Sequence, residues 1–103
     1  MAAKKTLINK VWIVYIVRCS DDTLYTGITN NLENRLIAHN RGIGAKYTCS
    51  RRPVVLSAVS NPMSRTDAMR LELRIKTLEK GKKIATLKMY AKKRGKIISK
   101  NIS

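Results

Sequence analysis

Residues 12–17 constrain the fold of this 103-residue chain more than any other segment. All six are β-branched or aromatic, which restricts χ1 and favours an extended strand over a helix. A polar cluster with turn chemistry follows at residues 20–23, and residues 24–28 then return to strand composition. A strand, a short polar turn and a second strand predict a β-hairpin.

The length of the turn decides which side chains share a face of this hairpin. If the loop has an odd number of residues, so that Cys19 pairs with Thr23, then Tyr15 lies opposite Gly27. Tyr25 then lies on the same face as Tyr15. Gly27 would leave room for the Tyr15 ring, which gives glycine a reason to occupy a strand interior. An even loop would separate the two tyrosines.

A basic helix is predicted directly after the hairpin, over residues 31–41, with Asn30 or Asn31 as its N-cap. Arg35 and His39 are four residues apart in this helix. They therefore lie on one helical face, with Cβ atoms about 6 Å apart. We expect both side chains to point at a common site.

The rest of the chain predicts one more strand and one more long helix. Glycine ends the first helix and opens a basic loop, after which residues 53–60 return to strand composition. Residues 64–78 predict a helix that Ser64 caps, with Asp67 completing an approximate capping box. Glu72 lies in the middle of this helix among apolar neighbours. A short helix is expected over residues 80–87.

These elements predict a single α+β domain: a three-stranded antiparallel sheet flanked by helices. The expected strands are at about 11–18, 23–28 and 53–60, and the expected long helices at about 31–41 and 64–78. A chain of this length has room for one compact core. The expected division is an N-terminal extension over 1–10, the domain over 11–88 and a basic C-terminal tail over 89–103.

The net charge indicates the partner. A formal charge of +16 predicts binding to a polyanion, and the phosphate backbone of nucleic acid is the obvious one. An acidic membrane is the competing interpretation, but no strongly amphipathic helix supports it, and residues 11–17 are too few to span a bilayer. Cys19 and Cys49 lack metal-ligand spacing, so we expect free thiols in a cytoplasmic protein.

Five sequence features occur together in one order. They are Val14-Tyr15-Ile16, Tyr25-Thr26-Gly27, Arg35 with His39, Gly44-Ala45-Lys46-Tyr47-Thr48, and Glu72 within residues 70–76. In this order they resemble the GIY-YIG nuclease superfamily, and within it the small single-domain UPF0213 group, over about residues 11–88. Either tyrosine triplet alone would carry little weight, whereas the combination is specific.

The resemblance implies metal-dependent, endonuclease-like hydrolysis of phosphodiester bonds in nucleic acid, with DNA favoured over RNA. It implies that Glu72 binds one divalent cation, Mg²⁺ or Mn²⁺, and that a tyrosine activates the attacking water; between Tyr15 and Tyr25 we favour Tyr15. Arg35 would stabilise phosphoryl charge, and His39 would orient the water or share in proton transfer. A free tyrosine has a pKa of about 10, so we expect nearby cationic groups to lower it.

Four basic residues outside the catalytic group are candidates for contacts with the nucleic acid. They are Lys46, Arg51, Arg52 and Lys76. The first three belong to the basic loop, and the fourth lies four residues after Glu72. That spacing also allows an ordinary ion pair between Lys76 and Glu72 on the helix surface.

Two other functions stay open. One is a nucleic-acid-binding module that keeps the fold with little or no nuclease activity. Larger members of the superfamily place an asparagine after the glutamate helix, whereas this chain has none there before Asn101 in the tail. The other is a protein-interaction adaptor whose charge serves solubility. Strand tyrosines are also common packing residues, which is the structural alternative for Tyr15 and Tyr25. The oligomeric state is not predicted.

Overall fold

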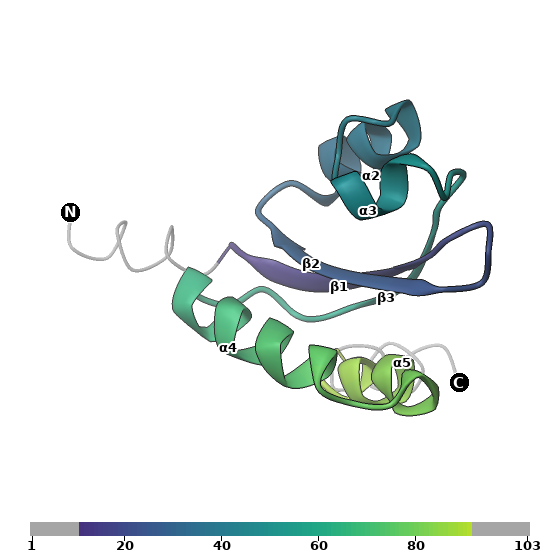
Figure 1. Ribbon diagram of the computed structural model, residues 1–103. Helices are drawn as coiled ribbons and strands as arrows, with labels where there is room; N and C mark the ends of the chain where they lie inside the picture. Colours follow the sequence, from purple (N-terminus) through teal and green to yellow (C-terminus); the bar gives the residue numbers. More distant parts are fainter. Residues whose placement is uncertain (1–10, 92–103) are drawn as a thin grey trace, which may run out of the picture.

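The computed structural model describes residues 11–91. The expected N-terminal extension and most of the expected basic tail, including Asn101, lie outside these residues. The elements in chain order are β1 (Ile13–Arg18), β2 (Leu24–Thr29), α2 (Leu32–Arg41), α3 (Lys46–Cys49), β3 (Val55–Val59), α4 (Arg65–Lys76) and α5 (Lys80–Lys88). The predicted α+β class is confirmed, and the predicted bounds agree within two residues (Figure 1). The short helix α3 was not predicted.

The three strands form one antiparallel sheet in the order β2-β1-β3. Beyond the ends of β1 and β2, the Cys19 amide donates to the Thr23 carbonyl at 2.8 Å, and this pair closes a hairpin loop of three residues, 20–22. Asp22 adopts the left-handed conformation, with φ of 69°, which suits the last residue of a three-residue hairpin loop. Tyr15 therefore pairs with Gly27 and Val17 with Tyr25. The predicted odd register is confirmed.

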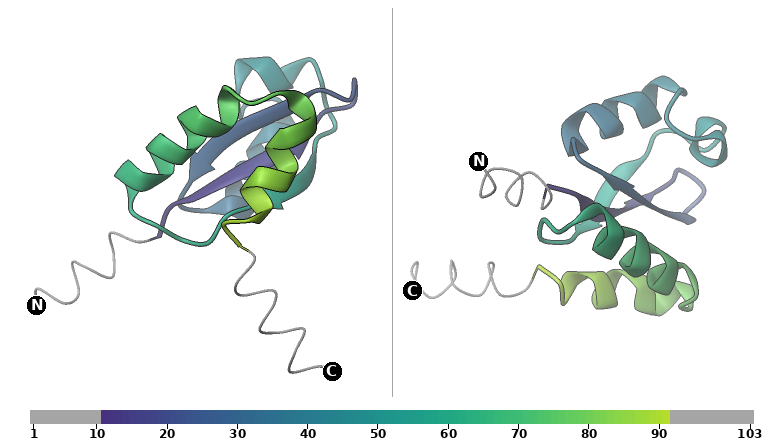
Figure 2. Two further views of the ribbon diagram at one scale, coloured as in Figure 1. Left: turned by 90° about the horizontal axis from the view of Figure 1, so that it is seen from below. Right: turned by 90° about the vertical axis from the view of Figure 1, so that its left-hand side faces the viewer.

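Helices cover both faces of the sheet (Figure 1). Helices α4 and α5 pack side by side under one face, as Figure 2 also shows, and α2 and α3 lie over the other. Alternate residues of a strand point to opposite faces. Val14 and Ile16 of β1 thus enter the apolar core with Leu71, Ile75 and Leu87. The same alternation sends the tyrosine face of the sheet toward α2.

That second face has its own smaller core. Tyr15 and Val17 pack there with Val54, and the partly buried Leu32 and Leu36 of α2 cover them. The apolar spacing of four in α2 therefore does what the sequence predicted: it seats the helix on the sheet. The opposite side of the same helix stays in solvent.

Local capping fixes where the long helices begin and end. The Asn31 side chain accepts from the Asn34 amide at 3.1 Å at the start of α2, and Gly42, with φ of 85°, ends that helix. Ser64 accepts from the Asp67 amide at 3.0 Å at the start of α4.

Between residues 11 and 91, no helix is long and apolar enough to cross a membrane.

Candidate active site

Tyr15 lies at the centre of β1, and its hydroxyl contacts two side chains of α2. The hydroxyl oxygen is 2.8 Å from His39 Nε2, and Arg35 Nε donates to it at 3.3 Å. The four-residue spacing of Arg35 and His39 brings both to the same phenol. The predicted convergence of these three side chains is therefore present in the structure.

Gly27 makes this packing possible. A Cβ atom at this position would lie 2.7 Å from the Tyr15 hydroxyl oxygen and 2.9 Å from Cζ of the same ring. Carbon atoms do not approach that closely, so any side chain here would displace the ring. Gly27 therefore leaves room for the Tyr15 ring, as the sequence predicted.

Thr48 completes a chain of hydrogen bonds behind His39. Its Oγ1 donates to the Ala45 carbonyl at 3.1 Å and lies 2.8 Å from His39 Nδ1. Because the threonine proton is committed to Ala45, Nδ1–H of His39 donates to Thr48, which leaves Nε2 to accept from Tyr15. Thr48 is fully buried and was not predicted as a site residue.

Burial determines the protonation of the two central groups. Desolvation lowers the pKa of His39, with a further contribution from the charge of Arg35, so the imidazole is neutral at pH 7. Desolvation also raises the pKa of Tyr15 above its usual value. The hydrogen bond and charge of Arg35 oppose that rise, and the charges of Tyr25 and Glu72 add to it. Arg35 thus lowers the pKa of Tyr15, as expected of a cationic neighbour, but the cost of burial outweighs this effect and the net pKa is raised.

Tyr25 lies on the same face as Tyr15, as the register requires. Its ring centroid is 6.4 Å from that of Tyr15 and 5.3 Å from that of His39. Tyr15, His39 and Thr48 are fully buried, whereas Tyr25 and Arg35 are half-buried and reach solvent.

Glu72 belongs to α4, which packs along the edge strand β2. The carboxylate is close enough for its charge to influence the pKa of Tyr15. Its Oε2 is 3.1 Å from Lys76 Nζ, and 20% of the Glu72 side chain is exposed. The ordinary helix-surface ion pair that was the alternative for Glu72 is therefore formed as well.

The chain matches the family described as the GIY-YIG catalytic domain over residues 11–85. The chain belongs to the GIY-YIG family. The UPF0213 protein of Staphylococcus haemolyticus is 52% identical over 71 residues, which are 69% of this chain and 87% of that protein. A UPF0213 protein of Nitratidesulfovibrio vulgaris is 47% identical over 77% of this chain and 72% of its own length.

Among solved structures, the chain is similar to the solution NMR structure of a UPF0213 protein from Bacillus halodurans. The two are 38% identical, with 76% of this chain and 83% of that chain covered and a TM-score of 0.47. The family match over residues 11–85 and the curated UPF0213 relatives confirm the predicted resemblance to the GIY-YIG superfamily and its UPF0213 group. The names of these relatives state no activity.

The residues of this GIY-YIG domain fit a magnesium site only in part. Between residues 11 and 91, no three His, Cys, Asp or Glu side chains gather to hold a metal ion. Glu72 would supply one carboxylate. Mg²⁺ often takes one or two protein carboxylates and completes its shell with waters and substrate phosphates. The site therefore fits an ion that binds together with a phosphate, and Lys76 would have to release Glu72.

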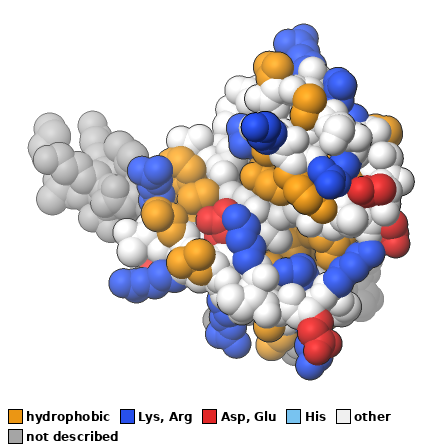
Figure 3. Space-filling view, in the orientation of Figure 1, with side chains coloured by type: hydrophobic (Ala, Val, Ile, Leu, Met, Phe, Trp, Pro, Cys, Tyr) orange, Lys and Arg blue, Asp and Glu red, His pale blue; other side chains and the backbone are white. Residues whose placement is uncertain are grey.

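The basic residues of the GIY-YIG domain differ in how much of their charge is free. Figure 3 shows Lys and Arg side chains spread over one face of the molecule, where acidic side chains are fewer. Lys46 and Arg52 are exposed, and the Arg52 Nε donates to the Cys49 carbonyl at 2.7 Å. Arg51 Nε lies 3.1 Å from Asp21 Oδ2, and Lys76 pairs with Glu72. Two of the four predicted nucleic-acid contacts are thus already engaged in ion pairs.

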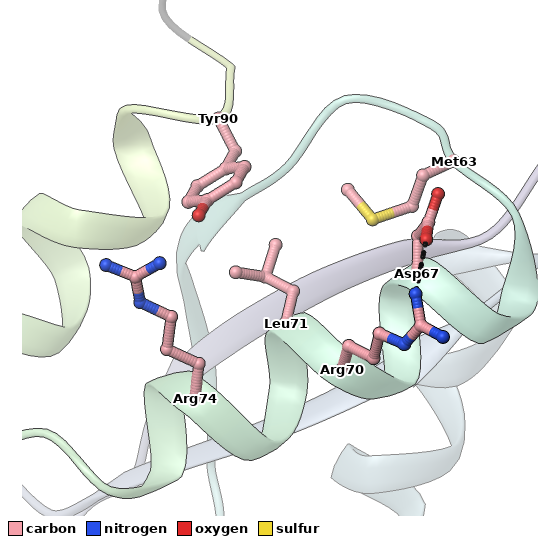
Figure 4. Close-up of a pocket in the computed structure, with 6 residues that line it drawn as sticks. All are labelled: Met63, Asp67, Arg70, Leu71, Arg74 and Tyr90. Carbon is pink, nitrogen blue, oxygen red and sulfur yellow. Dashed lines mark ion pairs between the residues drawn. The ribbon is translucent and has the colours of Figure 1, made fainter.

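Two cavities differ in their relation to this site. One, of about 290 Å³, opens beside the tyrosine cluster and is lined by Leu24, Tyr25, Thr26, Tyr47, Lys76 and Lys83. The other, of about 370 Å³, contains none of the predicted site residues and is lined by Met63, Asp67, Arg70, Leu71, Arg74 and Tyr90. Figure 4 shows it between Tyr90 and Met63 on one side and side chains of α4 on the other.

Proposed function

We propose that this protein is a metal-dependent nuclease that hydrolyses phosphodiester bonds in nucleic acid, with DNA favoured over RNA. The hydrogen-bond chain from Arg35 through Tyr15 and His39 to Thr48 carries the proposal. Membership of the GIY-YIG family and the formal charge of +16 support it. Hydrolysis of a phosphodiester needs a proton acceptor for water and neutralisation of phosphoryl charge, and these residues offer both.

The Tyr15–His39 pair would act as the base. A phenol with a raised pKa enters the reaction protonated, so Tyr15 would accept a proton from water while its own proton passes to His39 Nε2. The low pKa of His39 keeps that nitrogen free to accept at pH 7. Such a relay needs no resting phenolate.

Arg35 would control access to this pair. Tyr15 and His39 have no exposed surface, whereas Arg35 contacts the Tyr15 hydroxyl and also reaches solvent. If the guanidinium turns toward a bound phosphate, it stabilises the charge that builds up there and uncovers the hydroxyl. One movement would then couple substrate binding to activation of the base.

Glu72 would hold Mg²⁺ or Mn²⁺. When bound, the ion would neutralise charge on the phosphoryl oxygens and favour ionisation of the attacking water. The ion pair with Lys76 at 3.1 Å would give way to this coordination, freeing the lysine for the phosphate backbone.

A nucleic-acid-binding module with little nuclease activity is the second candidate. Two observations favour it: Tyr15 and His39 are fully buried, and Glu72 is already paired with Lys76. If these arrangements persist when nucleic acid binds, the charge would bind the backbone without cleaving it.

One experiment separates the two candidates. Labelled single- and double-stranded DNA and RNA are incubated with the protein in Mg²⁺, Mn²⁺ or EDTA. We expect metal-dependent cleavage by the wild type and none by Glu72→Gln, with binding in EDTA retained. Asp67→Asn is the matched control, because Asp67 is also an acid of α4 that pairs with a basic side chain, at 3.7 Å. Unchanged cleavage by Glu72→Gln would remove Glu72 from the mechanism. If the wild type binds nucleic acid but does not cleave it, the binding module is the better description.

A further inference from the structure

The pocket beside Tyr25 has an aromatic wall that the relay does not use. Tyr47 and Tyr25 both line it, with ring centroids 6.1 Å apart and ring planes inclined by 23°. Tyr47 is 38% exposed although it is a large aromatic side chain. A partly exposed aromatic ring that lines a pocket is suited to stacking with a flat ligand.

Tyr47 is held in place before any ligand binds. The Arg51 guanidinium carbon lies 3.9 Å from the Tyr47 ring centroid. Arg51 is itself fixed by Asp21 Oδ2 at 3.1 Å and by the Tyr47 carbonyl, to which it donates at 2.8 Å. Arg51 thus covers one face of the Tyr47 ring and orients it, so a flat ligand would have to stack on the other face, and binding would cost little further side-chain order.

Basic side chains also line the pocket. Lys76 of α4 and Lys83 of α5 line it, and Lys83 Nζ donates to the Ile75 carbonyl at 3.0 Å. Aromatic rings and ammonium groups in one pocket combine base stacking with attraction of the adjoining phosphates. A cavity of about 290 Å³ is slightly smaller than the usual ligand pocket of about 300–1,000 Å³, so it suits one ring system.

We propose that this pocket holds one unpaired nucleobase next to the phosphodiester that is cleaved, stacked against Tyr47, so that the preferred substrate is single-stranded. The inference rests on the proposed function for the position of the scissile phosphate. Within a duplex, both faces of a base are covered by its stacked neighbours, so only an unpaired base can offer a face to Tyr47. Tyr25 connects the pocket to the candidate active site, because its ring also packs against His39.

Equilibrium binding in EDTA tests the pocket without cleavage. A labelled single strand and the duplex of the same sequence are titrated with wild type, Tyr47→Leu and Tyr47→Phe. We expect Tyr47→Leu to weaken single-strand binding by about tenfold or more, with duplex binding and the Tyr47→Phe protein unchanged. Tyr90→Leu is the control: Tyr90 is 36% exposed and lines the remote cavity of Figure 4, so its loss should change neither affinity.

A scan of the substrate tests the same contact with the wild-type protein, whether or not Tyr47→Leu folds. A set of single strands is prepared, each lacking one base at a different position. We expect the loss of the base at one position to weaken binding as strongly as Tyr47→Leu does. At that position the loss should disappear in Tyr47→Leu if that variant folds. Three results would each overturn the proposal. They are equal single-strand affinity for Tyr47→Leu and wild type, equal weakening of duplex and single-strand binding in Tyr47→Leu, and a scan with no sensitive position. The proposed function fails separately, through absence of cleavage in Mg²⁺ while the binding pattern holds.

Discussion

Gly44 packs directly against His39: a Cβ atom on Gly44 would lie 2.6 Å from His39 Nδ1 and 2.8 Å from His39 Cα. The Cα belongs to α2 and cannot yield easily, so Gly44→Ala must displace the loop or the imidazole. We expect a loss of about 1–3 kcal/mol in the free energy of unfolding. We also expect a large fall in cleavage rate, because the bond between Nδ1 and Thr48 would be disturbed. Chemical denaturation and single-turnover cleavage measure the two effects.

Gly81→Ala is the matched control for this substitution. Among the described residues, no atom that could obstruct a Cβ on Gly81 lies within 4 Å, and Gly81 is inside α5. Alanine is the better helix former by about 1 kcal/mol, so Gly81→Ala should leave cleavage unchanged and hold or raise stability. If both variants behave alike, the contact between Gly44 and His39 does not position the ring.

Thr48 should act on the reaction only through the tautomer of His39. Thr48→Val keeps the volume but removes the hydroxyl that accepts from Nδ1–H. The buried donor loses its partner, at a cost of about 1–3 kcal/mol in stability, and the proton can move to Nε2, where it blocks the acceptor for Tyr15. We expect slower cleavage with unchanged nucleic-acid affinity, and recovery in Thr48→Ser. A purely structural role would lower stability in Thr48→Val without changing the cleavage rate of the folded protein.

His39 should make stability depend on pH in one window. Burial lowers its pKa in the folded state, so below about pH 6.5 the unfolded chain binds a proton that the folded chain does not. The contribution of His39 to the free energy of unfolding is therefore fully present above that pH, and it is lost as the pH drops toward the pKa of His39 in the folded state. Asp21 and Asp22, whose pKa values are lowered by their hydrogen bonds, contribute only below about pH 4. Chemical denaturation at a series of pH values between these limits measures this dependence. It should be weaker in His39→Gln, because the chain has a single histidine.

The hairpin and α2 were predictable from sequence because local rules decide them. A three-residue loop sets the register that places Tyr15 opposite Gly27, and a spacing of four in a helix places Arg35 beside His39. Neither inference needs knowledge of distant parts of the chain. The sequence therefore predicted which face of the sheet carries the site.

The loop after α2 was beyond the same reasoning. The contacts of Gly44 and Thr48 with His39 depend on how residues 42–52 fold back over the helix, and periodicity does not report that. The pairing of Arg51 with Asp21 joins two loops that are thirty residues apart. The rise in the pKa of Tyr15 also follows from burial, which composition does not predict for a single tyrosine.

The two tyrosines should differ in how strongly the reaction depends on them. Tyr15→Phe keeps the ring but removes the hydroxyl that joins Arg35 to His39, so we expect cleavage to fall by about 10²- to 10⁴-fold with a stability loss of about 1 kcal/mol. Tyr25→Phe leaves that chain intact and should lose less. Single-turnover rates across pH provide a second measurement: the dependence on His39 should disappear in Tyr15→Phe and persist in Tyr25→Phe. A larger loss in Tyr25→Phe would assign the activation of water to Tyr25, the tyrosine that already reaches solvent.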